Sequence, residues 1–435
     1  MGFEPVRAQG LPPLPKVSQI AMLVDDKNYS QVDLYGQIIL RSLPDDPHGN
    51  LACAWVAKQF GLFNNCRFHI NKAKRADRSL SDLSTDLHIQ PDCFDEATLP
   101  DSERFDVRET SQPAFHLMKA WGFGFGSEMA GLMGQAYLAE ILHRQPIVHW
   151  GENFLYREKG NHCVFQHFFK PFNPLTIKDI SNVSNHDIFP PKWNQQNLVK
   201  ENIQKREGPY SKLSALYYFQ RKEQLTVSDY YSGVINIRPL LLQDHPLLKM
   251  DFDQTYRYLV NKYLQVRDDI IVEAESFIKE KISSPYIAVH ARGSDKDEGY
   301  KALTSIPRKT LDYAKSKLSE MPAKAKLFLM TDDVNLLNIY QQEFGDRVIS
   351  TDSQRSSSEL GVHYDSSRDK TAAGIEVLID MLIAAKSNCF IGLGLSNPSQ
   401  LICYFGHFDP EDYILFGENR LKQFNTHLYK TIAVL

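Results

Sequence analysis

The sequence predicts an α/β protein with two Rossmann-like domains, each built on a parallel, doubly wound sheet, that face one another across a cleft. Short apolar runs typical of buried strands alternate with helical patterns in both halves of the chain. The 435 residues also exceed the size of roughly 250 to 300 residues at which one hydrophobic core stops growing. We expect residues 1–245 to form the first domain, with irregular insertions, and residues 246–435 to form the second.

In the first half, the expected elements are a strand at 18–25, a Gly-rich loop at 122–126, a helix at about 127–143 and a strand at 146–150. No clear strand precedes the loop. Residues 70–112 show no assignable pattern. Residues 170–215 are rich in Pro, Asn and Lys, which predicts loops and short helices.

The second half has the clearer alternation. Its expected elements are a helix at 252–282, a strand at 286–290, a helix beginning near Ser305 and Pro307, strands at 326–330 and 347–350, a helix at 371–386 and a strand at 389–393. Each half therefore supplies one sheet.

The composition is that of a soluble globular protein, with 43% hydrophobic and 23% charged residues. A net charge of -4 gives no general attraction for nucleic acid, so no nucleic-acid partner is expected. We expect a cytoplasmic protein, because no apolar run has the length of a signal peptide or a membrane span. The six scattered cysteines predict mostly reduced core thiols.

Polar side chains follow three strands of the second half. In chain order these residues are Arg292, Ser294, Asp295 and Lys296, then Asp332 and Asp333, then Gly394, Ser396, Asn397 and Ser399. Ligands of parallel sheets bind at the carboxyl ends of the strands. An Arg fork and a Lys suit phosphate oxygens, and a turn that starts a helix at Pro398 directs free N–H groups at an anion. Together they predict a diphosphate site.

Simpler interpretations remain open for these residues. Arg292 can pair with Asp295 or Asp333 in a surface network, and the turn before Pro398 can merely cap a helix. Asp380 lies in an apolar helix, where its carboxylate either accepts hydrogen bonds, for example from the N1–H and N2–H groups of a guanine, or faces solvent.

Metal and dinucleotide signals are weak. Asp295-Lys-Asp297 and Asp251-Phe-Asp253 match a metal-binding pattern, but such pairs occur by chance in this length, and Lys296 would repel a cation. We therefore expect no metal. The loop glycines do not fit the dinucleotide fingerprint, although the helix start after them can face a ligand across the cleft. His149, His162 and His167 lack a metal-binding spacing and are interpreted as ordinary polar histidines.

The order of these motifs resembles the α1,6-fucosyltransferases of N-glycan cores and nodulation factors and, more loosely, the protein O-fucosyltransferases. The matching segments are HARGSDK at 290–296, FLMTDDVNLL at 328–337, the stretch from Asp380 to Ser396, and the loop, helix and strand at 122–150. The resemblance covers residues 115–150 and 255–405.

The resemblance implies a GT-B fold, GDP-fucose as the donor substrate, inversion at the anomeric carbon, and neither a metal nor another cofactor. Arg292 would hold the β-phosphate, His290 and Asp380 would contact the nucleoside, and Asp332 and Asp333 would shape the cleft. The turn with Gly394, Ser396, Asn397 and Ser399 would line the phosphates, with Ser294 nearby, and Gly124, Gly126 and Ser127 would form the cleft loop of the first, acceptor-side domain. The acceptor would be a glycan or glycoconjugate, with peripheral membrane association only if it is lipid-linked.

Two positions depart from the family pattern. Gly293 stands where a second Arg is usual, and Tyr300 stands where a Glu assists at the acceptor. Glu298 and Asp297 are the candidate bases here, while Arg292 and Lys296 would stabilise the leaving diphosphate. A different sugar nucleotide, or a non-catalytic glycan-binding or regulatory protein with this fold, therefore stays open.

Overall fold

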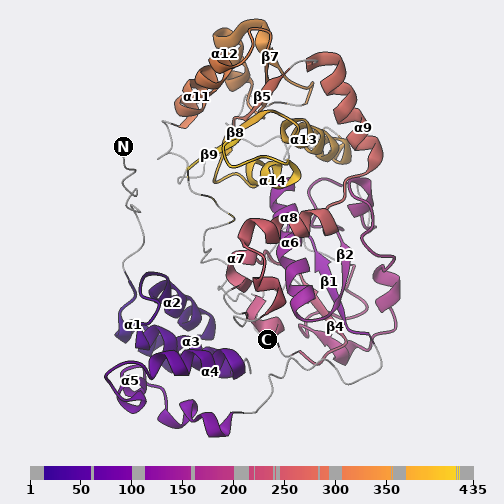
Figure 1. Cartoon of the computed structure of the whole chain (residues 1–435). Helices are drawn as coiled ribbons and strands as arrows, with labels where there is room; N and C mark the ends of the chain where they lie inside the picture. Colours follow the sequence, from indigo (N-terminus) through magenta and orange to yellow (C-terminus); the bar gives the residue numbers. More distant parts are fainter. Residues whose placement is uncertain are drawn as a thin grey trace.

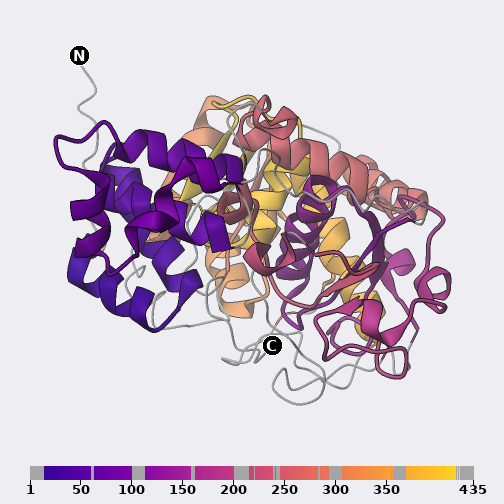
Figure 2. The ribbon, with the colours of Figure 1, turned by 90° about the horizontal axis from the view of Figure 1, so that it is seen from below.

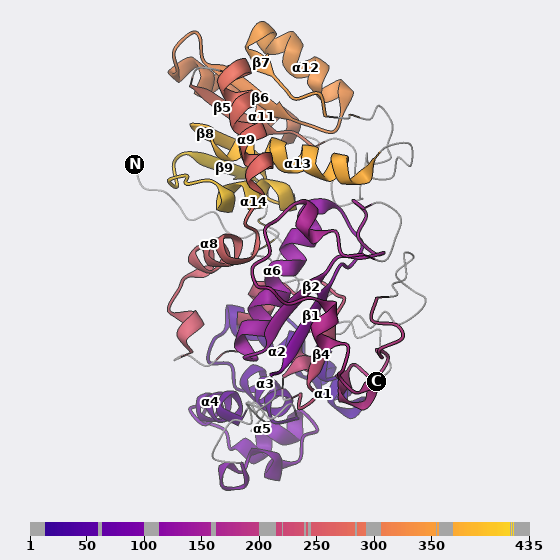
Figure 3. The same ribbon diagram turned by 90° about the vertical axis from the view of Figure 1, so that its right-hand side faces the viewer.

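The computed structural model describes residues 14–59, 63–99, 113–157, 162–199, 215–219, 221–238, 241, 245–282, 285–292, 306–353, 355, 369–417, 419 and 421 (Figure 1). It is a mixed α/β structure with two sheets of parallel strands. Figure 3 shows the second sheet above, the first sheet in the middle and the N-terminal helices below. The predicted fold class is confirmed.

Residues 17–99 form a group of helices that contributes no strand to either sheet (Figures 1 and 2). Its elements are α1 (Val17–Asp25), α2 (Tyr29–Ser42), α3 (Pro47–Gln59), α4 (Phe63–Ala73), α5 (Leu80–Asp86) and the 3-10 turns Pro91–Phe94 and Glu96–Thr98. The strand predicted at 18–25 is wrong. The segment is a helix that buries Ile20 and Val24 and leaves Met22 66% exposed, and its apolar run is too short for periodicity to separate helix from strand.

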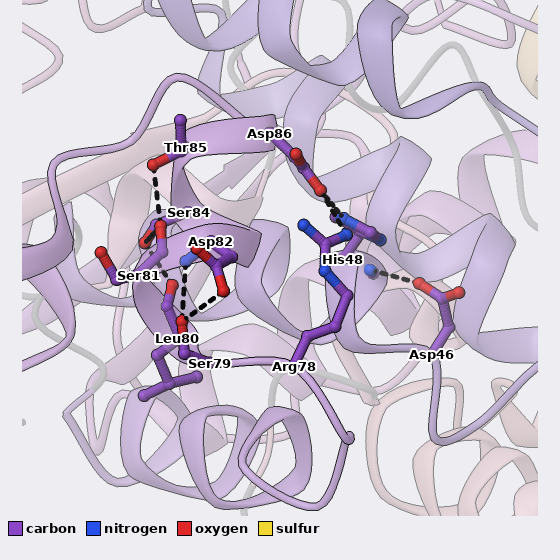
Figure 4. A network of polar contacts seen from close by, with 11 residues as sticks. Asp46, His48, Arg78, Ser79, Leu80, Ser81, Asp82, Ser84, Thr85 and Asp86 are labelled. Carbon is purple, nitrogen blue, oxygen red and sulfur yellow. Dashed lines mark hydrogen bonds and ion pairs between the residues drawn. The ribbon is translucent and has the colours of Figure 1, made fainter.

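A polar network ties the start of α3 to the end of α5 (Figure 4). Asp86 Oδ2 accepts a hydrogen bond from Arg78 Nη1 at 2.7 Å and lies 2.9 Å from His48 Nε2. Arg78, followed by His48, lowers the pKa of Asp86. Asp46 accepts from the backbone N–H of Gly49 at 2.7 Å. These contacts join α3 to α5.

The first sheet has the strand order β2-β1-β4-β3. Its strands are β1 (Phe115–Lys119), β2 (Gln145–His149), β3 (Ile188–Phe189) and β4 (Leu225–Ser228), and α6 (Phe125–Ile141) joins β1 to β2. A strand therefore does precede the Gly-rich loop, contrary to expectation. Two buried polar residues, His116 and Lys119, interrupt the apolar run of this strand, so the sequence does not show it. His116 Nδ1 lies 2.8 Å from Thr226 Oγ1, and the Lys119 ammonium donates a hydrogen bond to the Leu198 carbonyl.

Short elements fill most of the described residues between β2 and α8, as predicted for the described part of 170–215. They are the 3-10 turns Phe165–His167, Ile177–Ile180, Asn185–Asp187, Ala215–Tyr218 and Pro246–Leu248, and the short helix α7 (Val234–Ile237). All six cysteines are free, and four of them are buried. In the part of the chain that the structure describes, no helix is long and apolar enough to cross a membrane.

The second sheet has the order β7-β6-β5-β8-β9. Its strands are β5 (Tyr286–His290), β6 (Lys326–Met330), β7 (Val348–Ile349), β8 (Cys389–Leu393) and β9 (Tyr413–Phe416); the connecting elements are α11 (Ile306–Glu320), α12 (Val334–Phe344), the 3-10 turn Gly345–Arg347, α13 (Lys370–Ala385) and α14 (Asn397–Phe405). The strands and helices predicted from residue 286 onward are present, and β9 was not anticipated.

The single helix predicted at 252–282 is instead two, α8 (Phe252–Tyr263) and α9 (Asp268–Phe277), the second extended by a π-helical turn at Ile278–Ile282. The break is fixed by Val266, which forms a bridge with Phe169. α8 contacts both α6 and α14. Glu140 stabilises the contact between α6 and α8, because its carboxylate accepts hydrogen bonds from the hydroxyls of Tyr258 and Tyr263 of α8 at 2.9 and 2.7 Å.

Candidate functional site

The starts of α6 and α14 pack directly against each other. Each helix follows a strand, β1 or β8, and so begins at the carboxyl edge of its sheet. A Cβ atom added to Gly126 would lie 2.6 Å from Pro398 Cδ and 2.8 Å from Pro398 N, so only glycine permits this approach. The carboxyl edges of the two sheets, where parallel sheets bind ligands, therefore meet at these two residues.

The start of α14 carries unsatisfied polar groups. Ser396 is the N-cap, but its side chain caps no backbone N–H. Ser396 Oγ and Asn397 Oδ1 are buried, and neither has a hydrogen-bond partner among the described residues. Burying such atoms without a partner is unfavourable, and a helix N-terminus attracts negative charge. Ser396 Oγ can donate to an anion, whereas Asn397 Oδ1 can only accept and needs a donor. The α14 start is therefore suited to a ligand that carries both an anionic group and an O–H or N–H donor.

His290, the last residue of β5, is bonded to this helix. Its Nδ1 lies 2.7 Å from Ser399 Oγ, which also accepts from the backbone N–H of Leu393 at 3.0 Å. Burial first, and then the charge of Arg292, lowers the pKa of His290 to about 4, so the ring is neutral at pH 7. The hydroxyl proton of Ser399 can satisfy Nδ1, which leaves the ring proton on Nε2 as a donor.

The other predicted residues at these strand ends have different surroundings. Arg292 and Asp332 both lie near His290, since both affect its pKa, in opposite directions. Asp333 caps α12, accepting from the N–H of Asn335 at 2.7 Å, so its carboxylate is engaged in the fold. Gly394 shapes the turn, with its N–H bonded to the Phe416 carbonyl at 2.8 Å.

Asp380 is buried and paired, which excludes a solvent-facing position for it. Its carboxylate accepts from Thr351 Oγ1 at 2.6 Å and Ser353 Oγ at 3.2 Å, and burial raises its pKa to about 6 despite these bonds. Arg355 fixes the same segment by donating to the carbonyls of Thr351 and Ser353 at 2.7 and 3.0 Å. The sequence analysis did not predict roles for Thr351, Ser353 or Arg355. Two hydroxyl residues and an Arg that directly follow a predicted strand could have indicated a polar site there.

On the first sheet, Glu128 holds the Gly-rich loop. Gly124 is the N-cap of α6 and offers no side chain, and the buried Glu128 carboxylate instead accepts from the backbone N–H groups of Trp121, Gly122 and Phe123 at 3.0, 2.6 and 2.7 Å. The Trp121 indole N–H reaches the Ser127 carbonyl at 3.4 Å. Glu128 was not predicted, although an acid in the first turn of a helix is a known capping signal.

The same edge of the first sheet carries two more unsatisfied groups. His149 Nε2 and Ser228 Oγ, at the ends of β2 and β4, are buried without a hydrogen-bond partner in the described ranges. Burial, with Lys119 and His162 as further causes, lowers the pKa of His149 to about 3. His149 is thus a neutral polar side chain, and the described residues leave the hydrogen-bonding capacity of both groups unused.

Five residues of the predicted site, Ser294, Asp295, Lys296, Asp297 and Glu298, lie outside the described residues. Among the described residues, no group of three or more His, Cys, Asp or Glu side chains is arranged to hold a metal ion. Of the Asp-x-Asp pairs, Asp251 caps α8 by accepting from the Gln254 N–H at 2.7 Å, and Asp253 accepts from the Tyr404 hydroxyl at 2.9 Å. That pair therefore has a structural role.

No protein-family model and no curated protein matches the sequence. Among solved structures, NodZ α1,6-fucosyltransferase co-crystallized with GDP is similar at 18% identity and a TM-score of 0.45, over 68% of this chain and 93% of that chain. Fucosyltransferase NodZ from Bradyrhizobium is similar at 16% identity and 0.45, over 67% and 92%. POFUT1 in complex with GDP-fucose is similar at 14% identity and 0.42, over 71% and 100%. Identities this low transfer no residue role.

Proposed function

We propose that this chain is an inverting, metal-independent glycosyltransferase that transfers fucose from GDP-fucose to a hydroxyl of a glycan or glycoconjugate. The observation that carries the proposal is the start of α14, where two buried atoms lack a hydrogen-bond partner among the described residues: Ser396 Oγ, which can donate to a phosphate oxygen, and Asn397 Oδ1, which can accept from a sugar hydroxyl. The oxygens of a diphosphate there would accept hydrogen bonds from the free backbone N–H groups of the helix start. Arg292, two residues beyond β5, supplies the positive charge.

In the proposed reaction, an acceptor hydroxyl attacks the anomeric carbon from the face opposite the diphosphate. The carbon–oxygen bond to the β-phosphate breaks as the new glycosidic bond forms, which inverts the configuration. Negative charge grows on the departing phosphate, so donors fixed in advance stabilise the transition state more than the ground state. The acceptor proton passes to a carboxylate, for which Asp297 and Glu298 are the candidates. Unchanged turnover in EDTA would support the absence of a metal.

We propose that the guanine base of the donor is bound by two side chains, one a hydrogen-bond donor and the other an acceptor. The neutral His290 offers an Nε2–H donor, and the Asp380 carboxylate keeps lone pairs beyond the two hydroxyls that it accepts from. Guanine presents acceptors at O6 and N7 and donors at N1 and N2, which complements this pair. Adenine and uracil lack the adjacent N–H groups.

Thermal unfolding with GDP, UDP and ADP tests the proposed donor site. A nucleotide at 100 times its dissociation constant adds about 2.7 kcal/mol to the free energy of unfolding. We expect GDP to raise the unfolding temperature more than the other two. A larger shift with UDP or ADP would favour another sugar nucleotide, and no shift with any nucleotide would refute the donor site. A GDP shift without release of fucose from GDP-fucose would favour a non-catalytic glycan-binding protein.

A further inference from the structure

Gln400 forms hydrogen bonds with two segments of the second half that are separate in the chain. It lies in α14 and is buried. Its Nε2 donates to the carbonyl of Gly394, in the turn between β8 and α14, and its Oε1 accepts from the backbone N–H of Leu421 at 2.8 Å. Leu421 lies beyond β9 and is also buried. The Gln400 side chain therefore links the turn before α14 to the segment that follows β9.

The same turn is bonded to β9 and to α14 through its N–H groups. The N–H of Gly394 donates to the carbonyl of Phe416, the last residue of β9, at 2.8 Å. The N–H of Leu393 donates to Ser399 Oγ at 3.0 Å. Gln400 adds a bond of the other kind, because it fixes a carbonyl of the turn, that of Gly394.

The direction of the Gly394 carbonyl matters for an anion at this helix start. A carbonyl oxygen carries partial negative charge and repels a phosphate, whereas the N–H groups in the first turn of α14 attract it. Glycine has no Cβ that restricts its backbone dihedrals, so Gly394 does not fix its own peptide groups. The bond to Gln400 holds the Gly394 oxygen on a buried donor, and without that bond the peptide is free to turn the oxygen towards a bound phosphate.

Resting on the proposed function, we propose that Gln400 is a positioning residue, which keeps the turn at 393–397 in the conformation that stabilises the departing diphosphate. It acts through the Gly394 peptide and not by contact with the donor. Negative charge on the phosphate grows in the transition state, so a misplaced turn weakens binding of the transition state more than binding of the ground state. This role therefore predicts a loss of kcat that exceeds the rise in KM for GDP-fucose.

Two substitutions of Gln400 test the role. Gln400→Met keeps an unbranched side chain of similar length and removes both hydrogen bonds. Gln400→Glu keeps the acceptor for the Leu421 N–H, but an ionised carboxylate has no donor for the Gly394 carbonyl. Burial favours the protonated carboxyl, whose O–H is again a donor, so mild acid should restore the bond in this variant.

Gln265→Glu is the matched control, because Gln265 is exposed and its Nε2 donates to the Asn261 carbonyl at 3.2 Å. The measurements are KM and kcat for release of fucose from GDP-fucose, and hydrogen exchange of the backbone N–H groups at 393–397 without nucleotide. At pH 8 we expect both Gln400 variants to lose at least about tenfold in kcat, with KM changed less than about threefold, and to exchange faster in the turn.

The pH dependence separates positioning from a purely structural role. From pH 8 to pH 6, the kcat of Gln400→Glu relative to the wild type should rise at least about threefold, as its carboxyl regains a donor. The relative kcat of Gln400→Met and of Gln265→Glu should stay constant. A residue that only stabilises the fold would change the unfolding temperature and leave the kcat of the folded protein as it is in the wild type.

Failure of this inference and failure of the proposed function give different results. Unchanged kcat in both Gln400 variants of an active wild type, or exchange at 393–397 as slow as in the wild type, overturns the positioning role and leaves the transferase standing. A kcat of Gln400→Glu that does not recover in mild acid also overturns it, because the missing donor is then not the cause. A wild type with no nucleotide shift and no fucose release refutes the transferase, and the positioning role with it.

Discussion

Gly126 of the first half and Pro398 of the second are in van der Waals contact, and no other residue type fits at position 126 without displacing the proline. An added Cβ would lie 2.6 Å from Pro398 Cδ, closer than real Cβ contacts come. This contact joins the starts of α6 and α14, and with them the carboxyl edges of both sheets. A donor held at α14 would thereby face the loop that precedes α6.

Replacing Gly126 with Ala should push these two helix starts apart. Overpacking of this kind lowers the free energy of unfolding by about 1 to 3 kcal/mol, and we expect GDP affinity to fall as well. Gly124→Ala is the matched control, because a Cβ at Gly124 meets nothing within 4 Å. Chemical denaturation and GDP titration of both variants measure the difference. Equal behaviour of the two variants would show that the close contact does not matter for stability or binding.

Ser399→Ala should weaken both the fold and the proposed donor site. The change removes the partner of His290 Nδ1 and leaves the buried Leu393 N–H without an acceptor, which costs about 1 to 3 kcal/mol. We expect lower GDP affinity too, since the His290 ring loses its fixed orientation. Ser319→Ala is the control, because the Ser319 hydroxyl donates only within its own helix, to Ser316 O at 2.6 Å. A Ser399→Ala variant as stable as this control would contradict the role assigned to Ser399.

Buried histidines should make the protein less stable in mild acid. Burial lowers the pKa of His116 to about 3, below the unfolded value of about 6.5, so the unfolded state binds an extra proton in between. The free energy of unfolding should therefore rise with pH up to about 6.5, by about 1.4 kcal/mol per pH unit for each such histidine. In the His116→Asn variant, the free energy of unfolding measured by denaturation should rise less steeply between pH 5 and 6, by the contribution of one proton. An unchanged slope in His116→Asn would contradict the assignment.

Asp380 should give GDP binding a pH dependence. Burial raises its pKa to about 6, and only the ionised carboxylate can accept from both guanine donors, so GDP affinity should fall as the pH drops through 6. The free energy of unfolding changes in the opposite direction. The folded state binds the Asp380 proton more tightly than the unfolded state, so the stability that this proton contributes is lost as the pH rises from about 4 to 6. Asp380→Asn should bind GDP weakly at every pH. Calorimetric titration of GDP between pH 5 and 8 checks this, and a parallel pH profile in wild type and variant would refute it.

The sequence predicted the second sheet well, because β5, β6 and β8 are continuous apolar runs buried on both faces, and the polar residues after them are easy to see. It failed where local patterns are ambiguous. The run at 18–25 fits a strand as well as a helix, and β1 is masked by the buried His116 and Lys119.

The candidate site was predicted in outline only. His290, Ser396, Asn397 and Ser399 are brought to one helix start, but the contact of Gly126 with Pro398 and the bonds from Thr351 and Ser353 to Asp380 join residues far apart in the chain. No local pattern encodes such pairs. Glu128 was also missed, because its partners are backbone N–H groups of a loop whose conformation depends on Gly122.

The central claim is tested most directly by the rate at which fucose is released from GDP-fucose, to water or to acceptor, by the wild type and by Arg292→Ala. Deletion of one donor that stabilises developing charge typically lowers turnover by about 10² to 10³. We expect wild-type release with inverted configuration and a rate at least about a hundredfold lower in Arg292→Ala. Equal rates in the two proteins, or no release by the wild type, would contradict the account.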